Sequence, residues 1–123
     1  MTDNAQNRLA PVNRQRLQAA RLLSIRRAIP TDREIAELLG LETVSVDAWG
    51  RGEVLPREEH ERLVGLDVVV EMLTGVLEPS SIRKWLLGLN AHLSDRRPIH
   101  LLQAGRVSAV LAAVEAHVAG KFA

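Results

Sequence analysis

The 123-residue chain contains no cysteine and few aromatic residues, and both shortages exclude classes of structure and chemistry. Without cysteine the chain can form neither disulfide bonds nor thiolate metal sites. Aromatic residues make up 2% of the sequence while the hydrophobic share is 46%, mostly leucine, valine and alanine, and this balance favours an all-α fold. Four histidines lie at positions 60, 92, 100 and 117, and no two of them have ligand spacing on one helix face.

Long apolar runs and catalytic clusters are also missing. No apolar run approaches the roughly 18 residues that span a membrane, and the N-terminus lacks the apolar stretch of a secretory signal. No nucleophile is paired with a base, and no carboxylates or histidines cluster at catalytic spacing. We therefore expect a cytoplasmic protein that is not an enzyme and that uses no cofactor, metal or membrane.

The net charge of +1 conceals an uneven distribution of charge along the chain. Residues 1–30 contain six arginines and one aspartate, which gives +5. Residues 31–78 contain four arginines and twelve carboxylates, which gives −8. Residues 79–123 contain six basic residues and two carboxylates, which gives +4. The chain is thus basic, acidic and basic in turn, and the breaks between these segments coincide with its expected organisation.

Two helical domains are expected, preceded by an arm. The polar residues 1–11 predict a flexible arm, residues 12–76 a helix-turn-helix domain with a connecting helix, and residues 77–123 a small helical domain with a C-terminal tail. The boundary is placed after Gly75 and before Pro79, because proline cannot continue the preceding helix.

The first predicted helix covers residues 12–28, a run of good helix formers without glycine or proline. Ile29 ends it, because a residue before proline is driven out of the helical region. Three apolar residues cluster on one face of this helix: Val12, Ala19 and Leu23. Leu22 and Ile25 lie on other faces, so the apolar stripe is ragged.

The stretch of residues 30–56 has the pattern of two short helices joined by a turn. Thr31 and Glu34 have the spacing of a capping box, in which the hydroxyl accepts a backbone amide and the carboxylate reaches back. Gly40 best tolerates the left-handed conformation that ends a helix. A second short helix over residues 43–49 completes a helix-turn-helix.

This segment resembles the Xre/Cro-type helix-turn-helix over about residues 20–56. The matching positions are Ile35-Ala36, Gly40, Val46, Trp49, Gly52 and Pro56. The resemblance implies a five-helix domain whose third helix enters the major groove of DNA. It implies nucleic-acid contacts by Thr43, Val44, Ser45 and Ala48 toward the bases, and by Thr31 and Arg51 toward phosphates.

The charge of this segment opposes DNA binding. Paired hydrogen bonds to base edges normally come from Arg, Lys, Asn or Gln, and the expected reading face has none of them. Glu42 and Asp47 flank that face and would repel the phosphate backbone. Binding would therefore need either a dimer partner or the basic residues of the first helix, Arg14, Arg16 and Arg21. We expect weak, salt-dependent operator binding, and a scaffold that no longer binds DNA is the open alternative.

A connecting helix is predicted over residues 57–76. Its apolar positions are Leu63, Leu66, Val69, Val70 and Leu73. They exceed what one small domain can cover, so we expect a second copy to cover the remainder in a homodimer or higher oligomer.

The C-terminal third resembles the toxin-binding domain of Xre/MbcA/ParS antitoxins, from about residue 68 to the end. The matching positions are Trp85-Leu86, Asn90, Leu93, Pro98, Leu101-Leu102, Gly105, Val110 and Gly120. Most of them also have structural roles: Asn90 caps a short turn and Pro98 begins a helix. Ser80 or Ser81 is expected to cap the helix that contains Trp85.

The second resemblance implies an antitoxin that neutralises a RES-domain toxin, a class that attacks NAD. In that family the C-terminal segment is understood to block the NAD pocket of the toxin. We expect the last helix, over residues 107–119, to stop at a glycine and to leave an apolar ring at the chain end. The implied toxin-binding residues are Val118, Gly120, Lys121, Phe122 and Ala123, surrounded by Arg83, Arg96, Arg97 and Arg106. Two alternatives stay open: a frayed terminus without function, and a helix-turn-helix transcriptional regulator whose C-terminal region only dimerises.

Overall fold

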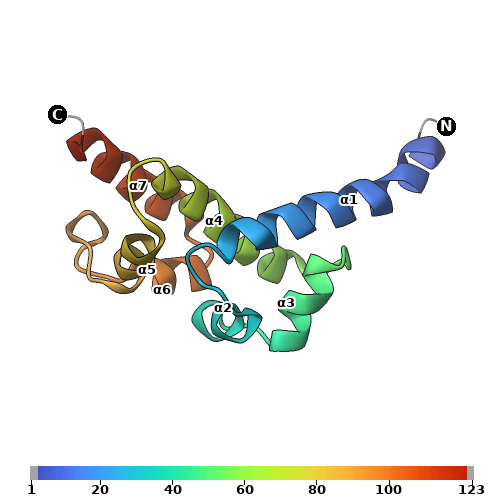
Figure 1. Cartoon of the computed structure of the whole chain (residues 1–123), viewed down its shortest axis with the longest axis horizontal. Helices are drawn as coiled ribbons and strands as arrows, with labels where there is room; N and C mark the ends of the chain where they lie inside the picture. The colour runs from blue at the N-terminus through green and yellow to red at the C-terminus, as the bar shows by residue number, and fades with distance from the viewer. Residues whose placement is uncertain (1–2, 122–123) are drawn as a thin grey trace.

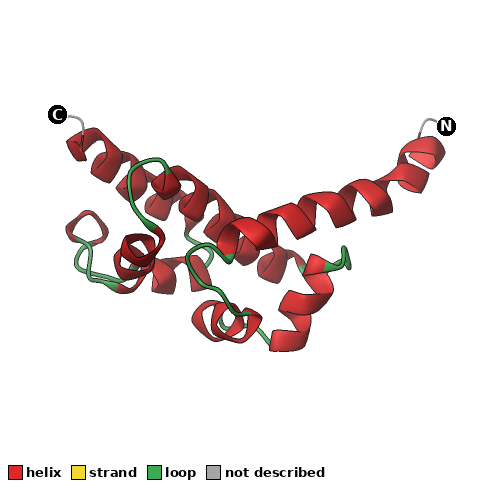
Figure 2. Ribbon diagram, viewed as in Figure 1, coloured by secondary structure: helices red, strands yellow, loops and turns green. Residues whose placement is uncertain are grey.

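The computed structural model describes the backbone of residues 3–121 and the side chains of residues 11–120. Over this range the chain forms seven α-helices and one 3-10 turn, with loops between them (Figures 1 and 2). Their bounds are α1 (Asp3–Ile25), α2 (Asp32–Leu39), α3 (Thr43–Gly50), α4 (Arg57–Thr74), α5 (Pro79–Leu87), η1 (Ala91–Leu93), α6 (Pro98–Gln103) and α7 (Val107–Lys121). The predicted all-α fold is confirmed. None of these helices is long and apolar enough to cross a membrane.

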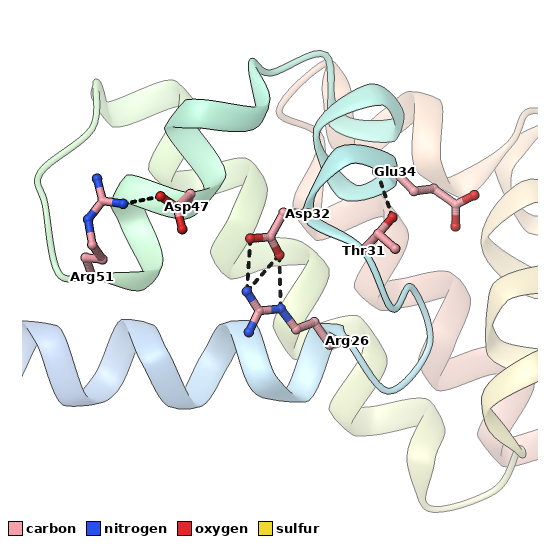
Figure 3. A network of polar contacts seen from close by, with 6 residues as sticks. All are labelled: Arg26, Thr31, Asp32, Glu34, Asp47 and Arg51. Atoms are coloured by element: carbon pink, nitrogen blue, oxygen red, sulfur yellow. Dashed lines mark hydrogen bonds and ion pairs between the residues drawn. The ribbon is translucent and has the colours of Figure 1, made fainter.

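Local sequence sets both ends of α2. The Thr31 hydroxyl accepts the backbone N–H of Glu34 at 3.2 Å, as predicted (Figure 3). Gly40 adopts a φ of 70°, also as predicted. The reciprocal bond of a capping box is replaced by another contact, because the Glu34 carboxylate binds Arg83 of α5 at 2.5 Å. Asp32 in the first turn of α2 accepts two hydrogen bonds from Arg26, which ties α2 to the end of α1.

Helix α1 differs from its prediction in extent and in orientation. It begins at Asp3 and passes through Pro11, so residues 3–11 are helical where an arm was predicted. Its buried face is formed by Gln18, Leu22 and Ile25, and the predicted apolar cluster faces solvent instead. The predicted face was wrong because Gln18 occupies an apolar position of the helical period. Its amide donates to the carbonyl of Trp49 at 2.6 Å, which satisfies a buried polar group.

Helix α4 lies at the centre of the fold, with α1 on one side and α7 on the other (Figure 1). The five apolar positions predicted to be buried have no exposed surface. The cover comes from the same chain, since α1, α5, α6 and α7 all contact α4. These five residues therefore need no second copy to cover them, contrary to expectation, although oligomerisation itself stays a prediction.

One hydrophobic core joins the two predicted domains. The predicted boundary falls in the loop between α4 and α5, yet buried side chains from Leu22 to Val114 form a single cluster. Polar bonds also cross the boundary: the Gln103 amide of α6 donates to the Leu38 carbonyl, and Arg83 pairs with Glu34. The two segments are thus packed together over a shared interior.

The C-terminal helices begin and end mostly at the predicted residues. Asn90 caps η1 by accepting the His92 N–H at 2.9 Å, Pro98 begins α6, and Gly105 follows α6 with a φ of 76°. Helix α5 begins at Pro79 with Glu78 as its N-cap, so neither predicted serine cap exists.

The predicted helix stop at Gly120 is also wrong. Helix α7 continues through Gly120 to Lys121. Glycine permits the left-handed conformation that ends a helix without requiring it, and Gly120 is not among the glycines with positive φ.

Candidate partner-binding surfaces

The outer face of α3 is the first candidate surface, because it was predicted to read DNA. Thr43 and Val44 are exposed, Val44 to 69%, while Ser45 and Ala48 are half-buried. Thr31 is exposed but its hydroxyl is already bonded to its own helix. The helix-turn-helix therefore presents a small face of two hydroxyls and a valine to solvent.

The predicted phosphate-binding arginine on this face is neutralised within the chain. The guanidinium of Arg51 pairs with Asp47 one turn earlier, as Figure 3 shows, and with Glu53 at 2.8 Å. The hydrogen bond to Glu53 and the charge of Asp47 raise the pKa of Arg51. A phosphate would have to replace these carboxylates, which weakens Arg51 as a DNA contact.

Two of the three arginines predicted on α1 are also engaged. Arg14 donates from Nε to the Gly52 carbonyl at 2.8 Å, and Arg21 pairs with Asp67 at 2.8 Å. Arg16 is exposed and makes no bond with the side chains that the structure describes. Of these three arginines, Arg16 is thus the one that remains available to an anionic partner.

An acidic depression of about 700 Å³ adjoins the start of α3. Glu42 lines it together with Glu58 and Glu59 from the first turn of α4, and Arg62 is the basic residue in its wall. The sequence placed Glu42 beside the reading face but gave no sign that α4 would bring two more carboxylates there. The added negative charge further opposes DNA binding.

The C-terminal end of α7 is the second candidate surface, because it carries the predicted toxin-binding tail. Val118 is half-buried against the core, and Gly120 is exposed. Lys121 is the last helical residue, while Phe122 and Ala123 lie outside the described residues. The tail therefore leaves the core as a continuous helix up to Lys121.

The loop of residues 94–97, called the basic loop, lies on the same side of the molecule as this end of α7 (Figure 1). The loop follows η1, which packs against α7. Arg96 donates from Nε to the Leu93 carbonyl at 3.0 Å, and Arg97 donates to the Leu87 carbonyl. Both arginines are exposed, and backbone carbonyls hold their guanidinium groups without neutralising them.

The other two predicted arginines are not part of this surface. Arg106 precedes α7, and Gly120 lies near the opposite end of that helix, about 20 Å away at 1.5 Å per residue. Arg83 is bonded to Glu34. Leu89 in the α5–η1 loop is 67% exposed and was not predicted to be part of a surface, because no residue near it in the sequence indicates its exposure.

Two aromatic–histidine pairs bind helices together. The Trp49 indole donates from Nε1 to His60 Nδ1 at 3.0 Å, so α3 is tied to α4. Trp85 of α5 meets His117 of α7 edge to face, with ring centroids 6.4 Å apart. His117 Nε2 is buried and has no partner in the described part of the chain. The described residues include no cluster of three or more ligands that could hold a metal ion.

A groove between α4 and the start of α7 is the third candidate surface. It has a volume of about 680 Å³, and Val64 and Val68 of α4 and Val107 of α7 line it. Gly65 makes the close approach of the two helices feasible, because a Cβ there would lie 2.9 Å from Val107 Cγ2. This groove was not predictable from the sequence, because its two walls are some forty residues apart in the chain.

Comparisons with known proteins place the chain in a family. No family model matches it. The mycobacterial cidal antitoxin MbcA of Mycobacterium tuberculosis and that of Mycobacterium bovis are each 31% identical over 93 residues, which is 75% of this chain and 82% of theirs. A probable mycobacterial cidal antitoxin of M. tuberculosis is 29% identical over 92 residues, 75% of this chain and 79% of its own length.

A solved structure agrees with these relatives. A chain in the crystal structure of the M. tuberculosis MbcT–MbcA toxin–antitoxin complex matches with a TM-score of 0.70 and 29% identity, over 83% of this chain and 94% of that one. Identity of this level over this length, with the same helical fold, shows that the chain belongs to the MbcA family of antitoxins and is not an enzyme.

Proposed function

We propose that this chain is the antitoxin of a toxin–antitoxin pair and that it neutralises, by direct binding, a RES-domain toxin that consumes NAD. The observation that carries the proposal is the match to a chain of the MbcT–MbcA complex, in which 94% of that chain is covered. The match also covers 83% of this chain, so the likeness extends over most of its helical fold.

The binding surface we propose consists of the C-terminal end of α7 and the basic loop with Arg96 and Arg97. An exposed apolar side chain, Leu89, adjoins the loop. Complementary potentials steer association and fix register, so this surface suits a toxin whose pocket rim is acidic. The backbone bonds of both arginines preorganise them, which lowers the entropy that binding would cost.

Inhibition, in this proposal, comes from residues 118–123 entering the NAD pocket, with Phe122 as the apolar anchor. Helix α7 extends to Lys121, so the anchor follows directly on a helix that the core holds through Val114. A side chain that follows a held helix loses less conformational entropy on entering a pocket than one on a freely moving segment. Aromatic side chains in closed pockets are frequent hot spots, for which truncation costs about 2 kcal/mol or more.

Co-expression with the product of the adjacent open reading frame tests the proposed pairing. We expect the two proteins to co-purify and the chain to restore growth to cells that the toxin arrests. Reversing both loop charges with Arg96→Glu and Arg97→Glu should weaken the complex, whereas Arg33→Glu on α2 should leave it intact. A neighbour that neither binds nor arrests growth would contradict the proposal.

Autorepression is a second candidate function, favoured by the intact helix-turn-helix with an exposed α3. We propose weak operator binding whose affinity depends more on arginines than on Thr43 or Ser45. Of Arg14, Arg16, Arg21 and Arg51, Arg16 has no competing bond in the described part of the chain and should contribute most. Arg16→Ala should lower the salt slope by about one phosphate contact in an anisotropy titration. Loss of specific binding in Thr43→Ala with normal binding by Arg16→Ala would contradict this assignment.

A further inference from the structure

The groove between α4 and the start of α7 has the size and lining of a small-molecule site. Its apolar walls come from Val64 and Val68 of α4 and Val107 of α7, and its volume is about 680 Å³. Gly65 is buried and brings the two helices so close that a Cβ there would lie 2.9 Å from Val107 Cγ2. Sites for small organic molecules have volumes of about 300 to 1,000 Å³ and mostly apolar walls with a few polar groups. The polar groups of the groove therefore decide which molecule it suits.

The two polar residues of α4 that line the groove have their acceptors engaged. The Glu61 carboxylate accepts a hydrogen bond from Arg57 Nε at 2.8 Å, so its charge is offset within the helix. His60 Nδ1 accepts the indole N–H of Trp49 at 3.0 Å. A neutral imidazole that accepts at Nδ1 carries its proton on Nε2, so His60 keeps a donor and no free acceptor. The α4 wall thus offers a ligand a donor rather than an acceptor.

Arg106 is the uncompensated charge of the groove. It lines the groove beside Ser108, it is exposed, and its side chain forms neither a hydrogen bond nor an ion pair within the part of the chain that the structure describes. A guanidinium binds a carboxylate through two parallel hydrogen bonds, which are stronger than those between neutral groups. One cation beside apolar walls matches one negative charge, which a carboxylate carries and a phosphate monoester exceeds. The groove is therefore complementary to an apolar molecule with a single carboxylate.

We propose that the α4–α7 groove binds a small amphipathic carboxylate, with its apolar part against the three valines and its carboxylate on Arg106. The site is separate from the proposed toxin-binding surface, because Arg106 and Gly120 lie near opposite ends of α7. It adjoins the helix-turn-helix instead, since His60 is hydrogen-bonded to Trp49 in the last turn of α3. A ligand that contacts His60 is thus one hydrogen bond away from α3. The inference holds whether or not the chain neutralises a toxin.

An NMR titration of the full chain with octanoate tests the site, with octanol and octylammonium as matched probes that differ only in their head group. We expect octanoate to bind with a dissociation constant of about 1 mM or below, and the other two about tenfold more weakly. Amide shifts should be confined to residues 60–68 and 105–109. The indole N–H of Trp49 should also shift, because it is bonded to His60. That of Trp85, which meets His117 instead, should stay unchanged.

Two arginine substitutions separate the carboxylate contact from a general effect of charge. Arg106→Ala should weaken octanoate binding about tenfold, to the level of octanol, and leave octanol binding unchanged. Arg27→Ala is the matched control, because Arg27 is also exposed but does not line the groove. Equal losses in both variants, octylammonium binding as tightly as octanoate, or no shift of groove residues at millimolar octanoate would each overturn the proposal. Groove resonances that move on dilution of the protein alone would place a second copy in the groove and would overturn it as well.

Discussion

The buried pair of Arg21 and Asp67 joins α1 to α4 and gives the most quantitative prediction. Arg21 Nη1 lies 2.8 Å from Asp67 Oδ2, and the exposed fractions of the two side chains are 26% and 2%. Burial raises the pKa of Asp67, the nearby Glu71 charge adds to the rise, and Ser24 and Arg21 oppose it. Asp67 Oδ1 and the Ser24 hydroxyl have no hydrogen bond of standard geometry in the described chain, so Arg21 is the main compensation for the buried charge.

Arg21→Ala should destabilise the fold far more than Asp67→Asn. Removing one partner of a buried pair leaves an uncompensated charge and costs about 3 to 5 kcal/mol. We expect about 3 kcal/mol for Arg21→Ala, because the partial exposure of Arg21 lets water reach the carboxylate. Asp67→Asn removes the charge together with the ion pair and keeps an oxygen that accepts from Arg21, so about 1 kcal/mol is expected.

The loss of unfolding free energy caused by Arg21→Ala should also become smaller as the pH is lowered from 7. The pKa of Asp67 is higher in the folded state than in the unfolded chain, so acidification protonates the folded state first and stabilises it relative to the unfolded state. Without Arg21 the pKa of Asp67 rises further, so acidification stabilises the folded state of the variant by a larger amount. Urea unfolding followed by circular dichroism at pH 7 and at about pH 5 measures both effects. Equal costs for Arg21→Ala and Asp67→Asn, or a pH-independent cost for Arg21→Ala, would refute the reasoning.

Three further substitutions test local features by the same urea unfolding. Thr31→Ala removes the α2 cap and should lower the free energy of unfolding by about 1 kcal/mol, whereas an unchanged value would mean that the cap does not stabilise the fold. Gly40→Ala should also cost about 1 kcal/mol, because φ is 70° although the nearest atom to the new Cβ, Arg62 Nη1, is 3.9 Å away. Gly65→Ala should cost about 1 to 2 kcal/mol despite better helix propensity, because its Cβ would meet Val107 at 2.9 Å, and a stabilised variant would show that α7 shifts freely.

Features set by neighbouring residues were predictable from the sequence. The ends of α2 follow from Thr31 and Gly40, and those of α6 follow from Pro98 and Gly105, because caps, prolines and left-handed glycines act over a few residues. The buried face of α4 follows from the helical period of its apolar residues. The family resemblance, carried by spaced positions rather than by one motif, is confirmed by the relatives.

Features set by distant partners were not predictable. Gln18 can be buried because carbonyls of α3 and the following loop accept hydrogen bonds from its amide. Asp67 can be buried because Arg21, which lies 46 residues earlier in the chain, donates a hydrogen bond to its carboxylate. The arginines predicted to form one toxin-binding surface are separated by the fold, with Arg83 bonded to α2 and Arg106 at the far end of α7. Charge and residue type alone cannot show which of these side chains are already engaged.

NAD turnover by the purified toxin, measured with the full-length chain and with a chain lacking residues 121–123, tests the proposed inhibition most directly. The last fully buried side chain of the described residues is Val114, so the deletion should leave folding unchanged. We expect the full-length chain to abolish turnover and the shortened chain still to bind the toxin while leaving the NAD pocket open. Equal inhibition by both chains would contradict the account and would place the inhibitory surface on the folded helices.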